Sequence, residues 1–362
     1  MQHTKLISAI VCLALFAALM SGCGQSAPAQ PTPAPTAAAT EYQWDFAKKN
    51  DGVNALKSTP ASQQGTVVEL EYETPAYAVN DLLGLDETLT KRALVYLPYG
   101  YDESKAYNIL YLLHGTKGEN DGPMEEFWLV QWGEQTRNLL DNMIEQGLCE
   151  PLIVVCPNYY SPVEGHPLGD AEAKALSEKR GDDFLFSETA EDGGTPDNPQ
   201  NIWPVYFGQE LRNKLIPAVE AAYSTYAKGD VSEANLIATR EHRAFAGLSR
   251  GSMTVARAGL TENTDIIAYF GNFSGIWQQF DAFKEALTGT YKDYPVKFWY
   301  NGNGRADFAK ANHDAFLEQV KAEMSEQFVD GENFAYVVLR DGAHMYFSWA
   351  VDLHNALLVF FK

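Results

Sequence analysis

Residues 247–251 read Gly247-Leu248-Ser249-Arg250-Gly251, and they stand between an apolar run at 243–248 and a helix-forming run at 252–260. A serine flanked in this way, after a strand and before a helix, is typical of a sharp turn that exposes a nucleophile. The two glycines are needed because a side chain at either flank would collide with neighbouring backbone. The pattern therefore predicts that Ser249 is a nucleophile on a strand-to-helix turn.

Strand-like and helix-like runs alternate along most of the chain outside this turn. Two alternating runs, 66–72 and 91–98, predict an antiparallel lead-in. Central strands are expected at 107–113, 152–156, 243–248, 266–270, 296–300 and 334–339, and helices at 134–145, 207–223, 252–260, 276–287, 311–327 and 346–361. This βαβ alternation predicts an α/β fold, with a mainly parallel central sheet and helices on both faces.

The N-terminal residues 1–22 have the pattern of an export signal. Lys5 precedes an uncharged apolar run at 6–20, which is shorter than the ~20 residues that a membrane span requires. Small residues then lead to Cys23, as in the cleavage site of a bacterial lipoprotein, so we expect Cys23 to carry a lipid. The alternative is a plain secretory signal with an incidental cysteine. Either way, the pattern places the mature protein outside the cytoplasm, and the first interpretation anchors it to the membrane.

Residues 23–41 are expected to form a linker, since 24–40 hold four prolines and no charge. Residues 42–362 then suit one large domain with an insertion at 157–204, which is long and rich in Gly, Pro, Asp and Glu. Long irregular connections in compact domains usually serve function, so we expect the insertion to shape a substrate cleft. Its acidic residues could gather a calcium ion, but a solvated acidic surface is favoured because their spacing fits no cation loop.

The formal net charge of −21 argues against nucleic acid as a partner, because a polyanion would be repelled. Neutral polysaccharides and small esters carry no such penalty. Cys149 and Cys156 are separated by an apolar strand-like run that holds them too far apart for a disulfide. No clustered His/Cys spacing is present, so the sequence predicts no metal site.

A serine nucleophile requires a base and an acid that orients the base. His344 is the expected base because it lies between the last predicted strand and the last predicted helix. Asp307 is the expected acid, since it follows the 296–300 strand in a glycine-rich turn. Asp341 is the rival, although it suits an Asp-Gly turn better. The order Ser249, Asp307, His344 matches that of α/β-hydrolase triads.

The tetrahedral intermediate of such a reaction needs two backbone donors for its oxyanion. One is expected to be the amide of Arg250, directly after the nucleophile. The second is expected from Thr116, where the 107–113 strand ends in a His-Gly turn, with Gly115 as the alternative donor. His114 is expected to brace this loop.

Several aromatic residues are expected near the cleft, where a ring can stack on a sugar or a phenolic acyl group. The candidates are Tyr159, Tyr160, Trp203, Tyr206, Trp277 and Phe280. We favour Trp277, which follows a central strand, and Trp203, at the end of the insertion.

The chain resembles the esterase D and feruloyl esterase group of α/β-hydrolases, carbohydrate esterases that include acetylxylan esterases. The resemblance spans roughly 66–361 and is carried by 107–115, 207–217, 223–226, 247–251, 304–307, and 342–344 with Trp349. It implies Ser249, Asp307 and His344 as triad, with neither metal nor organic cofactor. The chain departs from the family pattern at Arg250, Ser252 and Met345, residues that are expected to line the cleft.

These observations lead to the hypothesis of a lipid-tethered carboxylic-ester hydrolase outside the cytoplasm. Its expected substrate is acylated plant polysaccharide, from which it releases ferulate-type acids of xylan through an acyl-serine. Acetylxylan, a siderophore or another short acyl ester are alternatives within the same chemistry. The alternative of another class is a glycan-binding lipoprotein that has lost catalysis.

Overall fold

The computed structural model of the chain describes residues 42–118, 121–180 and 199–362. These residues belong to one compact unit, 40–362. The predicted signal, Cys23 and the linker lie outside the described residues, as do the acidic residues of the insertion at 182–197. Within the part that is described, no helix is both long and apolar enough to cross a membrane.

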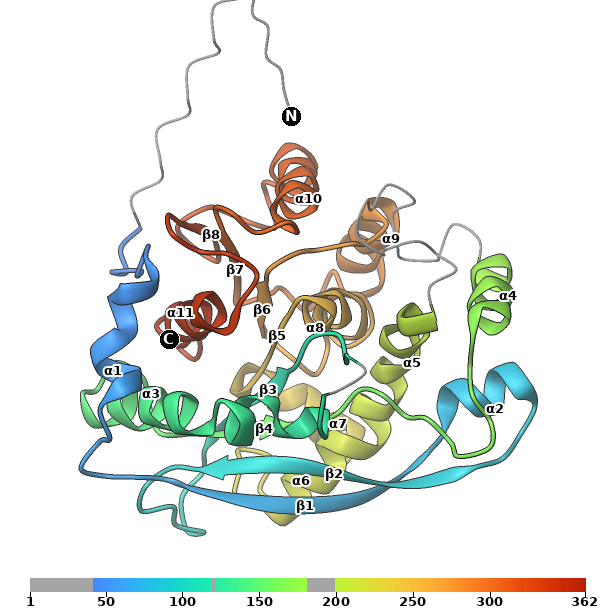
Figure 1. Cartoon of the computed structure of the whole chain (residues 1–362), viewed down its shortest axis with the longest axis horizontal. Helices are drawn as coiled ribbons and strands as arrows, with labels where there is room; N and C mark the ends of the chain where they lie inside the picture. The colour runs from blue at the N-terminus through green and yellow to red at the C-terminus, as the bar shows by residue number, and fades with distance from the viewer. Residues whose placement is uncertain (1–41, 119–120, 181–198) are drawn as a thin grey trace, which may run out of the picture. The chain divides into compact units, whose positions relative to one another are not determined.

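The described domain is built on an eight-stranded sheet with the order β1-β2-β4-β3-β5-β6-β7-β8 (Figure 1). The strands are β1 Thr66–Pro75, β2 Thr88–Leu97, β3 Asn108–Leu113, β4 Leu152–Cys156, β5 Arg243–Leu248, β6 Tyr269–Phe273, β7 Phe298–Gly304 and β8 Phe334–Leu339. The β1–β2 and β2–β4 pairs are antiparallel, and the pairs from β4 to β8 are parallel. The predicted fold class and its antiparallel lead-in are therefore confirmed.

Helices cover both faces of this sheet. They are α1 Asn54–Ser58, α2 Tyr77–Leu83, α3 Gly133–Glu145, α4 Asp170–Arg180, α5 Ile202–Glu210, α6 Ile216–Ala222, α7 Glu233–Ala238, α8 Arg250–Thr254, α9 Phe280–Glu285, α10 Lys310–Glu323 and α11 Tyr346–Leu357. Figure 1 shows α3 and α11 on one side of the sheet, and α5, α8 and α9 on the other.

Strand β3 explains why both faces must be covered. Successive side chains of a strand point to opposite faces, so its continuous apolar run supplies two cores. Ile109, Tyr111 and Leu113 enter the core beneath α5 and α6, whereas Leu110 and Leu112 enter the core beneath α3 and α11. Because the neighbouring strands from β4 to β8 in the sheet are parallel, their carboxyl ends lie at the same edge of the sheet.

Several predicted boundaries were wrong. The strand expected at 266–270 is β6, three residues later, because Ile266 and Ile267 close a turn onto the carbonyl of Asn263. The helix expected from 276 begins at Phe280, so Trp277 lies before it. The helix expected from 207 begins at Ile202, inside the insertion. Short apolar runs do not reveal their own ends by periodicity.

The insertion is also more regular than predicted, since its described part contains α4 and the start of α5. Helices α2 and α7 were not predicted either, because each is a short run without an apolar period of its own. Cys149 and Cys156 are both buried and unpaired, in agreement with the strand that separates them.

Candidate active site

Ser249 occupies a strained turn between β5 and α8, with φ 53° and ψ −122°. Both flanking glycines are required by close backbone contacts. A Cβ at Gly251 would lie 2.1 Å from the carbonyl oxygen of His114, and one at Gly247 would lie 2.8 Å from the backbone of Gly251. The sequence pattern therefore produces the predicted nucleophile turn.

The three predicted reacting side chains lie in one hydrogen-bonded row. Ser249 Oγ is 3.0 Å from His344 Nε2, and His344 Nδ1 is 2.9 Å from Asp307 Oδ1. Because a carboxylate only accepts hydrogen bonds, Nδ1 carries the imidazole proton and Nε2 accepts from the serine hydroxyl. This arrangement can take a proton from Ser249 as its oxygen attacks a carbonyl carbon.

Asp307 is held as a buried carboxylate. Burial alone pushes its pKa up, but hydrogen bonds from His344, Ser274 and the Ala309 amide, with the charge of His344, leave the pKa below its usual value. The rival Asp341 lies elsewhere, since its carboxylate accepts a hydrogen bond from the Asn50 amide.

Two backbone N–H groups next to Ser249 are available as donors. They are not the amide of Ser249 itself, because that amide already donates to the Phe273 carbonyl at 2.8 Å. The Arg250 amide is the first of α8, where helical N–H groups have no partner within the helix. Among the described residues, no hydrogen bond is formed by the Thr116 amide, and Thr116 lines the same cavity as the serine. The two predicted oxyanion donors are thus brought to the same place.

His114 braces the loop, as expected. Its ring is buried, stacks on Tyr159 with 4.3 Å between centroids, and has Nδ1 2.7 Å from the Gly115 carbonyl oxygen. Burial lowers the pKa of His114 to about 3, so the imidazole is neutral near pH 7. It is therefore not a rival base.

A cavity of about 310 Å³ opens over Ser249 and His344. Its other lining residues are Gly115, Thr116, Asp121, Met124, Phe127, Gln131, Leu248, Phe308 and Trp349. Phe308 is 56% exposed, and its ring centroid lies 4.1 Å from that of His344. The cavity thus has the size and mixed lining of a site for a small aromatic or acyl group.

The two tryptophans predicted to bind substrate do not line this cavity. Trp277 is buried in the segment before α9, and Trp203 is buried in α5 against Tyr160. Three side chains that support the site were not predicted in these roles, namely Ser274, Phe308 and Trp349. Ser274 follows β6. Phe308 lies next to Asp307 and Trp349 lies five residues after His344, and this closeness in sequence could have identified both residues.

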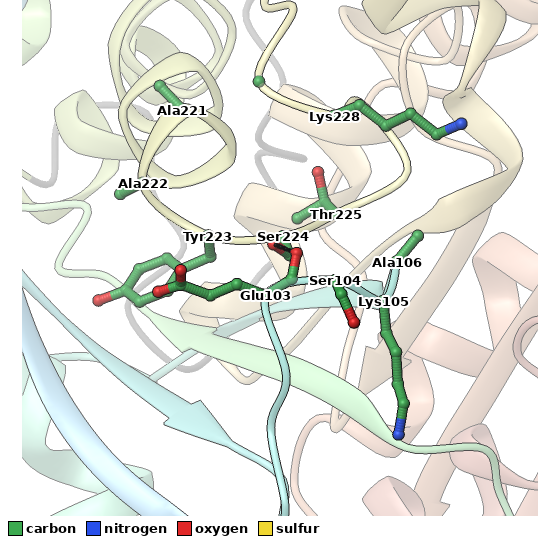
Figure 2. Close-up of a pocket in the computed structure, with 11 residues that line it drawn as sticks. Glu103, Ser104, Lys105, Ala106, Ala221, Ala222, Tyr223, Ser224, Thr225 and Lys228 are labelled. Atoms are coloured by element: carbon green, nitrogen blue, oxygen red, sulfur yellow. Dashed lines mark hydrogen bonds between the residues drawn. The ribbon is translucent and has the colours of Figure 1, made fainter.

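A larger cavity of about 500 Å³ lies apart from Ser249, between residues 103–106 and 221–229 (Figure 2). Figure 2 shows Lys105 and Lys228 extending in different directions, with their ammonium groups far apart in this view. Ser224 is already hydrogen-bonded to the Glu103 carbonyl at 2.8 Å. This cavity holds no arrangement of nucleophile and base. In the described ranges, no cluster of three or more His, Cys, Asp or Glu side chains could hold a metal ion.

Comparison with known proteins agrees with this geometry. No family model matches the chain. Endo-1,4-beta-xylanase Y of Acetivibrio thermocellus is 30% identical over 283 residues, which are 75% of this chain and 22% of the xylanase. The chain thus spans about a fifth of that relative's length.

Two solved structures cover nearly all of the domain. FAE is 26% identical, with a TM-score of 0.65 over 90% of this chain and 97% of its own. A serine-to-alanine mutant of the feruloyl esterase module from Clostridium thermocellum, complexed with sinapinate, is also 26% identical, with a TM-score of 0.63 over 90% of this chain and 95% of its own. The chain therefore has the α/β-hydrolase fold and is similar in sequence and structure to feruloyl esterases. These similarities support its assignment as a serine carboxylic-ester hydrolase.

Proposed function

We propose that this protein is a feruloyl esterase that hydrolyses hydroxycinnamoyl esters of xylan, with Ser249 as nucleophile, His344 as base and Asp307 as its orienting acid. The observation that carries the proposal is the row of hydrogen bonds from Ser249 through His344 to Asp307 at the floor of a cavity. The choice of acyl group is supported by similarity to a feruloyl esterase module that binds sinapinate and to a xylanase.

The reaction follows from the geometry in two steps. His344 Nε2 removes the proton of Ser249 as Oγ attacks the ester carbonyl carbon, and the amides of Thr116 and Arg250 stabilise the oxyanion. When this intermediate collapses, the bond to the sugar oxygen breaks and His344 gives that oxygen the proton. Water then attacks the acyl-serine with His344 as base again, releasing the free acid and restoring Ser249.

The cavity lining suits an aromatic acyl group. Met124, Phe127, Phe308 and Trp349 provide apolar and aromatic surface beside the serine, whereas Gln131 and Asp121 can meet the polar substituents of a phenol. A polysaccharide bound outside the cavity needs no charge, which is consistent with the net charge of −21.

The N-terminal sequence supports a location for this activity. We infer that residues 1–22 direct export and that a lipid on Cys23 anchors the enzyme, with residues 24–41 as a spacer. Incorporation of labelled palmitate into the wild-type chain, but not into Cys23→Ala, tests the lipid. A labelled Cys23→Ala variant contradicts it.

The decisive experiment is rapid-mixing hydrolysis of methyl ferulate and 4-nitrophenyl acetate by the wild type, Ser249→Ala and Ser104→Ala. Ser104 lines the cavity that is distant from Ser249, so it is a matched control. We expect the wild type and Ser104→Ala to turn over both esters, and kcat of Ser249→Ala to fall by roughly 10⁴-fold or more. A higher kcat/KM for ferulate supports the acyl group proposed. Activity on acetate alone favours a short-acyl esterase, and glycan retention without turnover favours a binding protein.

A further inference from the structure

The peptide bond between Gly115 and Thr116 is held by its carbonyl oxygen. Tyr159 Oη donates a hydrogen bond to this oxygen at 2.6 Å, and His114 Nδ1 lies 2.7 Å from it. Two donors on one carbonyl oxygen fix both the position of the oxygen and the plane of the peptide. Tyr159 comes from the segment after β4, far in sequence from the loop that it holds.

Because this carbonyl is fixed, the direction of the next N–H group, that of Thr116, is fixed as well. In a trans peptide the C=O and the following N–H point in opposite directions in one plane. The Thr116 N–H therefore points away from Tyr159. Ser249 lies close to this loop, since a Cβ at Gly115 would be 3.4 Å from Ser249 Cβ and both loop residues line the cavity over the serine. The orientation of a proposed oxyanion donor is thus set by a hydroxyl that never touches the substrate.

The Tyr159 ring is itself immobilised. It is 1% exposed, it stacks on His114 with 12° between the ring planes, and Tyr160 and Phe207 pack on it with centroids 4.7 and 6.3 Å away. Burial raises the pKa of Tyr159 well above its ordinary value, so the hydroxyl keeps its proton and remains a donor.

The same loop is also held through the side chain of Thr116. Arg250 Nε donates to Thr116 Oγ1 at 3.1 Å, and the same guanidinium donates to Asn201 Oδ1. The Arg250 side chain limits movement of Thr116, but it does not set the plane of the peptide. That plane depends on the two donors to the Gly115 carbonyl.

We infer that Tyr159 is a positioning residue for the oxyanion hole: its hydroxyl holds the Gly115 carbonyl so that the Thr116 N–H meets the oxyanion of the tetrahedral intermediate. The inference rests on the proposed esterase function and deepens it. It concerns the transition state, so it predicts an effect on kcat for every acyl group rather than on substrate binding.

The test compares Tyr159→Phe with Tyr111→Phe in the full chain. Tyr111 is equally buried, in β3, and its hydroxyl donates to Glu220 at 3.3 Å without contacting the loop. Tyr159→Phe should lower kcat roughly tenfold for both ferulate and acetate esters with little change in KM, less than the hundredfold or more expected when a donor is lost outright. Tyr111→Phe should leave kcat unchanged. Thermal unfolding of both variants checks that each one is folded.

A second readout separates positioning from a general structural effect. A trifluoromethyl ketone bearing a phenolic ring forms a tetrahedral adduct with the serine, whereas free ferulate does not. The Ki of the ketone should rise by the same factor as kcat/KM falls in Tyr159→Phe, while the Ki of ferulate should stay constant. Unchanged kcat and ketone affinity in a folded Tyr159→Phe would overturn the inference. An inactive wild type would instead refute the proposed function.

Discussion

Ser274 Oγ donates a hydrogen bond of 2.7 Å to Asp307 Oδ2, the carboxylate oxygen that does not contact His344. Trp349 Nε1 donates in turn to Ser274 Oγ at 2.7 Å, so the serine hydroxyl is fixed in the direction of the carboxylate. In this position the backbone of Ser274 is strained, with a φ of 59°. Both oxygens of Asp307 are therefore hydrogen-bonded, Oδ1 to His344 and the Ala309 amide and Oδ2 to Ser274.

Ser274→Ala should lower kcat roughly five- to tenfold, because a charge-assisted hydrogen bond that orients Asp307 is lost. KM should change little, since Ser274 does not line the cavity. Steady-state kinetics with methyl ferulate measures both. Ser161→Ala is the control: its buried hydroxyl donates to Glu210 at 3.0 Å, away from the triad. Equal kcat in wild type and Ser274→Ala would mean that Asp307 needs no such support.

The positions of the triad residues could be predicted because chain order and strand ends constrain them. Ser249, Asp307 and His344 each follow a predicted parallel strand, and the carboxyl ends of such strands meet at one edge. Ser274 has no comparable signal, since a single serine after a strand is common. Its role depends on a positive φ and on contacts with residues 33 and 75 positions away, which periodicity cannot reveal.

Gly251→Ala should abolish turnover and lower the free energy of unfolding by about 1–3 kcal/mol. The added methyl would lie 2.1 Å from the His114 carbonyl oxygen, so the nucleophile turn or the oxyanion loop must move. Gly289→Ala is the control, because open space surrounds that position. Urea unfolding and ester hydrolysis test both variants. An active, stable Gly251→Ala would show that the turn tolerates the displacement.

The aromatic residues around the cleft were harder to predict than the triad. Trp277 and Trp203 carry large rings in plausible segments, but both rings are buried outside the lining of the Ser249 cavity. The direction of a side chain depends on where the helix begins, and both helix starts lay about four or five residues from the predicted ones. Phe308 lies beside Asp307 and faces the cavity instead.

Phe308→Ala should raise KM for methyl ferulate roughly five- to tenfold and leave KM for 4-nitrophenyl acetate within twofold. The reason is that the exposed ring beside His344 can pack on an aromatic acyl group but hardly on an acetyl group. Tyr99→Ala is the control, since Tyr99 is 59% exposed and does not line the cavity. A parallel rise for both esters would point to disturbance of His344 rather than to acyl recognition.

His313 lies behind the site as a fully buried neutral imidazole in α10. Its Nε2 is 3.0 Å from Asn301 Oδ1, and its Nδ1 accepts from the Gly275 amide at 3.2 Å. Since Nδ1 accepts a hydrogen bond, protonation of Nδ1 would place its new N–H against the N–H of Gly275. Burial, the largest cause, lowers the pKa of His313 to about 3.

This depressed pKa makes stability fall in acid. The unfolded histidine takes up a proton below about pH 6.5, whereas the folded one stays neutral down to about pH 3, so its contribution is present above pH 6.5 and is lost as the pH falls toward 3. One such histidine costs about 2 kcal/mol of unfolding free energy by pH 5. His313→Gln should therefore lose roughly 1–2 kcal/mol less than the wild type between pH 7 and pH 5, as measured by urea unfolding. His166→Gln, a partly exposed control, should follow the wild type. Parallel pH curves for wild type and His313→Gln would show that His313 becomes protonated without unfolding, and that the hydrogen bonds to Asn301 and Gly275 do not lock it in the neutral form.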